Sequence, residues 1–98
     1  MKHFVYLLIS EQKKRLISYV GYTNNITKRL KLHNTSKGAK FTRGRKWKII
    51  YKKIYNTKNE AMKYEYELKK DRNKREKLKK AFKLKQKKNH ENFYFTSI

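Results

Sequence analysis

The sequence predicts a small α/β (α+β) domain of order β-β-α-β-α-α, in which helices flank a three-stranded antiparallel sheet. Two apolar segments rich in β-branched and aromatic residues lie close together near the N-terminus. A third such segment follows a helical pattern in mid-chain, and a capped helical pattern begins directly after it. A sheet with helices packed against it supplies the layers that one small core needs.

The first two strands are expected as a hairpin. Residues 3–9 form a continuous run of apolar, β-branched and aromatic residues, which predicts a buried strand. The polar stretch from Ser10 to Arg15 is expected to be the hairpin loop, and residues 16–22 its antiparallel partner. Gly21 within that partner strand indicates a β-bulge or a close approach of another group to the backbone.

A helix is expected over residues 25–34, with Thr23 or Asn24 as its N-cap. Ile26, Leu30 and His33 recur on one face of this helix. A basic loop with two glycines follows over residues 34–46, and residues 47–55 are expected to be the third strand.

The C-terminal part is expected to be helical. Thr57 and Glu60 have the spacing of a capping box, so a helix should begin at residue 58. It should run at least to Lys70 and then continue, or break and restart, to about residue 84. Residues 93–95 are expected to dock as a short tail strand or to fray. We therefore expect a domain over residues 1–84 and a basic, aromatic tail over residues 85–98.

Length and composition limit the function. The chain has 98 residues, with 29 Lys and Arg against 7 Asp and Glu, a net charge of +22, and no Cys. This length allows one domain and excludes a large active site built between two domains. The absence of Cys excludes disulfides and thiolate metal sites, and a cytoplasmic location is expected. No apolar run approaches the ~18 residues of a membrane span.

The charge indicates a polyanionic partner, with nucleic acid as the first candidate and an anionic membrane as the second. Lys outnumbers Arg by 23 to 6, a bias that an AT-rich genome would also explain. Leu, Ile, Val and Phe total 22 of 98 residues. This share is close to the ~20% level below which highly charged chains tend to be disordered, so the residue pattern has to decide for a folded domain.

Glu65 is the acidic residue that the helical pattern makes unusual. It lies four residues after Ala61 and three before Leu68, the best inward-facing positions of the helix. An unpaired carboxylate on a buried face is costly, and a divalent cation such as Mg²⁺ is a suitable partner. The alternative is a surface ion pair with Lys69 one helical turn later, worth a few tenths of a kcal/mol.

Arg29 and His33 share a helix face, and an arginine there suits a phosphate group. The alternative is a solvated arginine and a structural histidine. Tyr6, Tyr19 and Tyr22 lie on the hairpin, and the odd separation of the last two places them on opposite faces. Nearby cations can lower the pKa of a tyrosine and make it a usable proton acceptor. The alternative, a core aromatic ring with its hydroxyl at the rim, is favoured for each tyrosine taken singly.

The loop around residues 37–48 forms a basic strip with two aromatic residues, Phe41 and Trp47. Its cations suit phosphate contacts and its aromatic rings suit base stacking, whereas the alternative for the rings is core packing. The basic residues of this strip are Lys37, Lys40, Arg43, Arg45, Lys46 and Lys48.

Together these residues resemble the GIY-YIG nuclease superfamily, most closely its small stand-alone bacterial members, over about residues 3–80. Phe4-Val5-Tyr6 stands at the first motif and Tyr19-Val20-Gly21 at the second, with twelve residues between the two tyrosines. The remaining matches are Arg29, His33-Asn34, the run Gly38-Ala39-Lys40-Phe41-Thr42-Arg43, and Ala61, Glu65 and Lys69. The glycine and isoleucine of the first motif are replaced here.

The resemblance implies a metal-dependent endonuclease that hydrolyses phosphodiester bonds in DNA, in repair or recombination. Glu65 would hold Mg²⁺ or Mn²⁺, and Tyr6 would act as general base or orient the water. Arg29 would stabilise charge on the scissile phosphate. Tyr19 would support the site by hydrogen bonding, and His33 and Lys40 would assist near the phosphate or the leaving oxygen. The remaining implied roles are contact with nucleic acid by Lys69 and a structural motif of Gly21, Tyr22 and Thr23.

The expected partner is DNA, with RNA as a further possibility, and the expected state is a monomer or a weak homodimer. No membrane partner is expected. The alternative function is a nucleic-acid-binding module of the same fold with little or no cleavage activity, because resemblance does not establish turnover.

Overall fold

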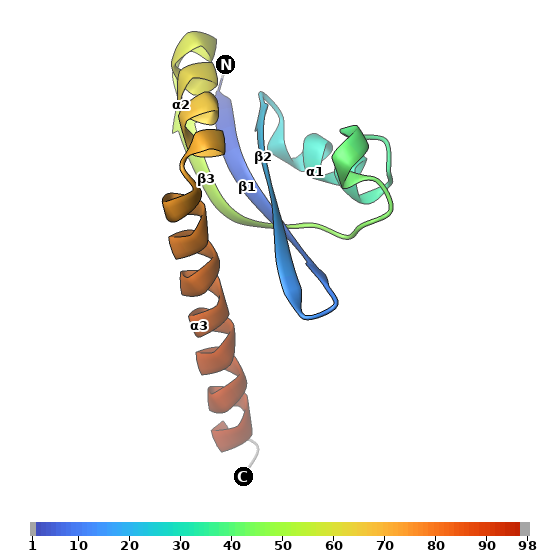
Figure 1. Ribbon diagram of the computed structural model, residues 1–98, viewed down its shortest axis with the longest axis vertical. Helices are drawn as coiled ribbons and strands as arrows, with labels where there is room; N and C mark the ends of the chain where they lie inside the picture. The colour runs from blue at the N-terminus through green and yellow to red at the C-terminus, as the bar shows by residue number, and fades with distance from the viewer. Residues whose placement is uncertain (1, 97–98) are drawn as a thin grey trace.

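The structure, a computed structural model, describes residues 2–96, with side chains described for residues 2–86. The predicted order of strands and helices is confirmed (Figure 1). The elements are β1 (His3–Gln12), β2 (Arg15–Thr23), α1 (Ile26–Asn34), a 3₁₀ turn (Lys40–Thr42), β3 (Lys48–Tyr55), α2 (Lys58–Lys70) and α3 (Arg72–Thr96). Within the described residues, no helix is both long and apolar enough to cross a bilayer.

The sheet has the order β2-β1-β3, and both pairings are antiparallel. Val5 and Leu7 of the central strand pack into the core cluster that contains Leu68 of α2. Tyr6 and Leu8 point to the other face, in a cluster that residues of α1 complete. Figure 1 shows α1 on one side of the sheet and α2 with α3 on the other. Because β1 is covered on both faces, its sequence is a continuous apolar run.

The hairpin loop is shorter than the sequence predicts. β1 and β2 pair up to Gln12 and Arg15, so only Lys13 and Lys14 form the turn, not the whole stretch from Ser10 to Arg15. Both lysines have positive φ, at 49° and 66°. A two-residue turn with this left-handed backbone matches the twist of the paired strands. The pairing therefore keeps two lysines in a conformation that Gly and Asn usually adopt.

Side chains cap the first two long helices. At α1 the N-cap is Asn25, not Thr23 or Asn24 as predicted, and its side chain accepts a hydrogen bond from the Lys28 N–H. Thr23 instead accepts from the Asn25 N–H at 3.1 Å, in the turn before the helix. At α2 the predicted cap is confirmed: Thr57 accepts a hydrogen bond from the backbone N–H of Glu60 at 3.2 Å.

The C-terminal helical region breaks at Asp71. α2 ends at Lys70, and the Asp71 carboxylate accepts a hydrogen bond from the Lys74 N–H at 3.0 Å, which starts α3. Leu78 of α3 packs on the core beside α2. Since α3 extends to Thr96, the short strand predicted over residues 93–95 is wrong.

Candidate active site

A buried chain of hydrogen bonds links β1, α1 and the loop that follows α1. The Tyr6 hydroxyl lies 2.9 Å from His33 Nε2, and His33 Nδ1 lies 2.9 Å from Thr42 Oγ1. The Thr42 hydroxyl donates to the Ala39 carbonyl at 2.7 Å. Its single proton is then used, so it accepts from His33 Nδ1–H. His33 Nε2 is therefore the acceptor, and Tyr6 donates its proton to it.

Two glycines leave the space that the side chains of this hydrogen-bond chain occupy. A Cβ on Gly21 would lie 2.3 Å from the Tyr6 hydroxyl oxygen, and a Cβ on Gly38 would lie 2.5 Å from His33 Nδ1. Gly21 pairs directly with Tyr6 in an unbroken β1–β2 register. Of the two predictions for Gly21, the close approach is confirmed and the bulge is not found; the irregularity in the sheet lies between Leu7 and Leu8, on the β3 side.

Arg29 extends from α1 toward the Tyr6 hydroxyl. Its positive charge acts on Tyr6 and lowers the pKa of that hydroxyl. Its Nε atom is buried and has no hydrogen-bond partner. A buried guanidinium donor without a partner is costly, and an anionic oxygen at this position would satisfy it.

Burial overrides the cations at Tyr6. The Tyr6 side chain is 1% exposed, and loss of hydration raises its pKa to about 12 although Arg29 lowers it. The expectation that nearby cations lower the pKa of this tyrosine is therefore wrong, because desolvation of a phenolate outweighs one neighbouring charge. Burial and the Arg29 charge together lower the pKa of His33 below 6.5, which keeps this ring neutral.

The other two motif tyrosines, Tyr19 and Tyr22, point to opposite faces of the sheet, as their spacing predicts. The Tyr19 ring packs 5.2 Å from the ring of His33, on the α1 side of the sheet. Tyr22 points to the opposite face, where its hydroxyl lies 2.7 Å from His3 Nδ1. Gly21, Tyr22 and Thr23 thus contribute backbone space, packing and a turn hydrogen bond, whereas Tyr19 lies in the site.

Glu65 lies on the rim of the site with its side chain 12% exposed. The Lys69 ammonium is 2.8 Å from its Oε1 atom, so the ion pair considered as the alternative is present. Glu65 also contributes to raising the pKa of Tyr6, which places its charge within electrostatic reach of the hydroxyl. Lys69 lines one small cavity together with Tyr19, which connects the Glu65–Lys69 pair to the candidate site.

Glu65 is the residue that would hold a divalent metal here. Among the described side chains, no group of three or more His, Cys, Asp or Glu residues is suited to a metal ion. Mg²⁺ does not need such a cage, because it is commonly bound through one or two carboxylates, water and substrate phosphates. The carboxylate of Glu65 fits an ion whose coordination is completed by a phosphate and water.

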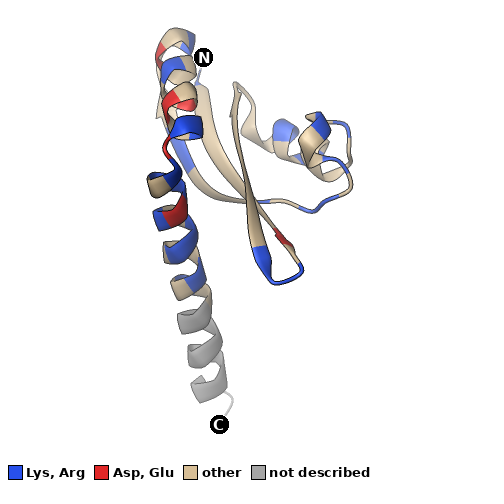
Figure 2. Ribbon diagram, viewed as in Figure 1, with Lys and Arg blue, Asp and Glu red and all other residues tan. Residues whose placement is uncertain are grey.

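The basic loop surrounds this site, and its two aromatic residues have different surroundings. Trp47 is 3% exposed and packs in the core, whereas Phe41 is 51% exposed. Phe41 stacks on Tyr19 and carries the Arg45 guanidinium 5.0 Å from its ring centre. Core packing is thus found for Trp47 only. Figure 2 shows the basic residues of this loop beside α1. Lys37, Lys40, Arg43 and Lys46 are exposed.

Asn34 fixes the ends of this loop. Its Oδ1 accepts a hydrogen bond from the Trp47 N–H at 2.6 Å, and its Nδ2 donates to the Trp47 carbonyl at 3.2 Å.

The sequence did not single out Thr42 or Gly38 as contributors to the site. Both lie in the run 38–43, but only the fold places them against His33, and residue types alone carried no signal of it.

Comparisons with known proteins show the family of this chain. The GIY-YIG catalytic domain family matches residues 2–92. A UPF0213 protein of Oceanobacillus iheyensis is 45% identical over 69 residues, which cover 69% of this chain and 77% of that protein. A UPF0213 protein of Bacillus licheniformis is 58% identical over 53 residues, or 53% of this chain and 55% of that protein.

The solution NMR structure of a UPF0213 protein from Bacillus halodurans is 37% identical, covers 83% of this chain and 85% of that one, and has a TM-score of 0.46. The match of the catalytic-domain family spans nearly the whole chain, and the first relative shares its pattern over more than two thirds of its own length. The chain therefore belongs to the GIY-YIG family.

Proposed function

We propose that this protein is a metal-dependent endonuclease that hydrolyses phosphodiester bonds in DNA. The observation that carries the proposal is the unpartnered Arg29 Nε beside the buried Tyr6–His33 hydrogen bond. The pair can accept the proton of the attacking water, and the guanidinium of Arg29 can bind an oxygen of the phosphate. Hydrolysis of a phosphodiester uses both contributions. DNA repair or recombination in the cytoplasm is the proposed setting, with the protein acting as a monomer or weak homodimer.

Tyr6 and His33 would remove the proton of the attacking water. With a pKa of about 12, Tyr6 is protonated at neutral pH and cannot act as a free phenolate. As the water oxygen bonds to phosphorus, its proton passes to the Tyr6 oxygen while the Tyr6 proton passes to His33 Nε2. His33 is neutral and already donates its other N–H to Thr42, so it is prepared to receive this proton.

Arg29 would stabilise the negative charge that grows on the phosphate as the bond to the leaving oxygen breaks, and the leaving oxygen would take a proton from solvent water. Glu65 would hold Mg²⁺ or Mn²⁺, which when bound supplies Lewis-acid polarisation of the phosphate. Lys69 would be released from its ion pair with Glu65 to contact the backbone. Lys40 and the other exposed cations of the loop would hold the adjacent phosphates, and Tyr19 would support His33.

One observation favours a second function, a nucleic-acid-binding module with little or no cleavage. Glu65 is neutralised by Lys69 at 2.8 Å, and a metal has to compete with that ammonium. If the ion pair persists on DNA, the fold and its charge would still bind DNA, or RNA, without catalysing hydrolysis.

Nicking of supercoiled plasmid tests the proposal. Wild-type protein is incubated with Mg²⁺ or Mn²⁺, with and without EDTA, beside Glu65→Ala and the matched control Glu67→Ala, which changes an exposed acid on the same helix. We expect metal-dependent nicking that Glu65→Ala abolishes and Glu67→Ala retains. Tight binding by the wild type with no nicking of any DNA form would establish the binding module instead.

A further inference from the structure

A second basic surface lies away from the catalytic residues, between the start of β2 and α3. It is an open groove of about 550 Å³. Ten residues line it, of which seven are basic, one is acidic and one, Leu16, is apolar. The basic residues are Lys14, Arg15, Arg72, Arg75, Lys79, Lys80 and Lys83. Figure 2 shows basic residues both at the β1–β2 turn and along α3.

The groove side of α3 has a helical period. Its lining residues recur from Arg72 to Lys83 at the spacing of one helix face. At a rise of ~1.5 Å per residue this face covers about 16 Å, close to five base steps of ~3.4 Å. Like charges held this close repel one another, and a polyanion with evenly spaced charges relieves the repulsion.

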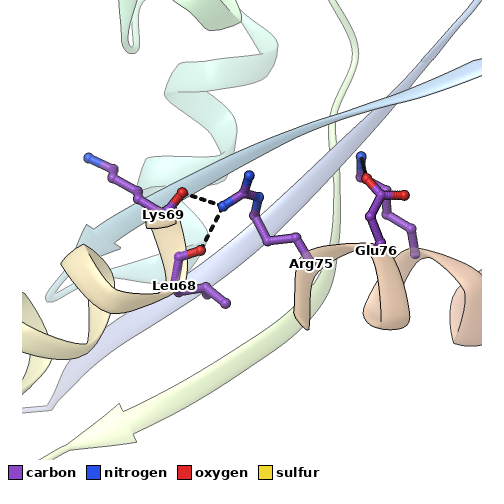
Figure 3. A network of polar contacts seen from close by, with 5 residues as sticks. Leu68, Lys69, Arg75 and Glu76 are labelled. Atoms are coloured by element: carbon purple, nitrogen blue, oxygen red, sulfur yellow. Dashed lines mark hydrogen bonds and ion pairs between the residues drawn. The ribbon is translucent and has the colours of Figure 1, made fainter. Parts of the chain in front are cut away.

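Two of the cations in the groove already have partners. Arg75 donates hydrogen bonds to the carbonyls of Leu68, at 2.9 Å, and Lys69 at the end of α2 (Figure 3). This contact satisfies carbonyls that the last helical turn leaves unpaired and sets the direction of α3. Lys79 pairs with Glu76 at 3.0 Å. The described ion pairs include none of the other basic residues of the groove, namely Lys14, Arg15, Arg72, Lys80 and Lys83.

The groove continues to the candidate active site. A smaller cavity of about 230 Å³ is lined by Ser18, Tyr19, Val20, Lys69 and Arg75. It shares Ser18 and Arg75 with the groove, and it contains Tyr19 and Lys69 of the site. A strand of nucleic acid in the groove would therefore follow β2 directly to Tyr19 and the Glu65–Lys69 pair.

We propose that the α3–β2 groove is a second nucleic-acid surface, which binds the phosphate backbone of the DNA segment flanking the cleaved bond. The proposal rests on the proposed function only in taking DNA as the ligand, and it does not require cleavage. The basic loop holds the reacting phosphate, and the groove holds the neighbouring duplex. The groove then supplies non-specific affinity, because it offers charge and almost no apolar or base-reading groups.

The test is the salt dependence of binding by the full-length chain to a fluorescein-labelled duplex in EDTA, measured by fluorescence anisotropy. The groove variant combines Arg15→Gln, Arg72→Gln and Lys83→Gln. The control variant makes the same charge change at exposed positions outside the groove, with Lys58→Gln, Lys63→Gln and Lys77→Gln. The single substitutions Arg15→Glu and Lys83→Glu, at exposed positions, repeat the test if the triple variant does not fold.

We expect the groove variant to reduce the slope of log affinity against log salt by about 2–3, since each phosphate contact contributes ~0.9. The control should change the slope by less than ~1. Equal slopes for the groove variant and the control would overturn the proposal. So would wild-type binding to phosphatidylserine vesicles that exceeds binding to the duplex and is lost in the groove variant alone.

The plasmid nicking assay separates this proposal from the proposed function. Loss of slope in the groove variant, with no nicking by the wild type, would keep the groove and reject the endonuclease. Nicking by the wild type, with an unchanged salt slope in the groove variant, would keep the endonuclease and reject the groove as a nucleic-acid surface.

Discussion

The hydroxyl of Tyr6 donates a hydrogen bond to Nε2 of His33 across 2.9 Å, between the central strand and the face of α1. Both side chains are almost completely buried, at 1% and 0% exposure. The tyrosine is held protonated and the histidine neutral, because burial raises the pKa of the first and lowers that of the second. The pair is thus a donor and an acceptor set for proton transfer, and four predictions follow from its surroundings.

Tyr6→Phe should abolish plasmid nicking and leave DNA binding in EDTA unchanged. The substitution removes only the hydroxyl that passes the proton, while the cations of the loop remain. It also leaves His33 Nε2 unsatisfied, so the free energy of unfolding should fall by about 1–3 kcal/mol. Tyr22→Phe is the matched control, since its hydroxyl bonds to His3 on the opposite face. Nicking by Tyr6→Phe at the wild-type rate would remove this hydroxyl from the mechanism.

His33 should make the stability of the protein sensitive to mild acid. The folded protein holds the pKa of His33 below 6.5, so the unfolded chain binds the proton first as the pH falls. The free energy of unfolding should therefore decrease as the pH falls through 6.5 to the lowered pKa, and level off below it. Urea unfolding between about pH 7.5 and pH 5 measures this loss. The decrease should be smaller in His33→Gln and retained in His3→Gln; an identical decrease in both variants would assign it elsewhere.

Thr42 is expected to be a positioning residue that acts on the proposed reaction through its hydrogen bond to His33. Thr42→Val keeps the shape of the side chain but removes the acceptor for His33 Nδ1–H. The ring can then carry its proton on Nε2, where it can no longer accept the proton of Tyr6. We expect nicking to fall by about tenfold or more and its pH profile to move, with rescue by Thr42→Ser. Nitrogen chemical shifts of His33 report the tautomer, and an unchanged tautomer in Thr42→Val would contradict this role.

Gly21→Ala should damage the site without a change in charge. The new Cβ would lie 2.3 Å from the Tyr6 hydroxyl oxygen, so the ring has to move and its bond to His33 has to break. We expect a loss of nicking and a destabilisation of about 1–3 kcal/mol from overpacking. Gly44→Asn is the control, because Gly44 has open space around it and a φ of +75° that Asn tolerates. Full activity in Gly21→Ala would show that the position of Tyr6 is not critical.

The order of the elements could be predicted because it depends on local patterns. The apolar run of β1 follows from its burial on both faces, and the capping box at Thr57 places the start of α2. The separation of Tyr19 and Tyr22 determines that they face opposite sides of the sheet. Membership of the GIY-YIG family could be anticipated for the same reason, since its motifs are short and ordered along the chain.

Details that depend on competition between neighbours could not be predicted. Which of three polar residues caps α1, and where the β1–β2 turn closes, are decided by small differences in hydrogen bonding. Residues 93–95 are helical, although their aromatic composition favours a strand. For the α1 cap and the β1–β2 turn, several local conformations are close in energy, and the hydrogen bonds of the folded chain select one.

The sequence by itself determined the charge, the strand and helix pattern, and which residues are candidates for the site. Only the tertiary structure decided their state. It buries Tyr6 and so raises its pKa rather than lowering it, and it brings Thr42 to His33. Hydration and hydrogen-bond partners belong to the packed interior, where residues far apart in the chain remove water from one another, and residue spacing contains no measure of that loss.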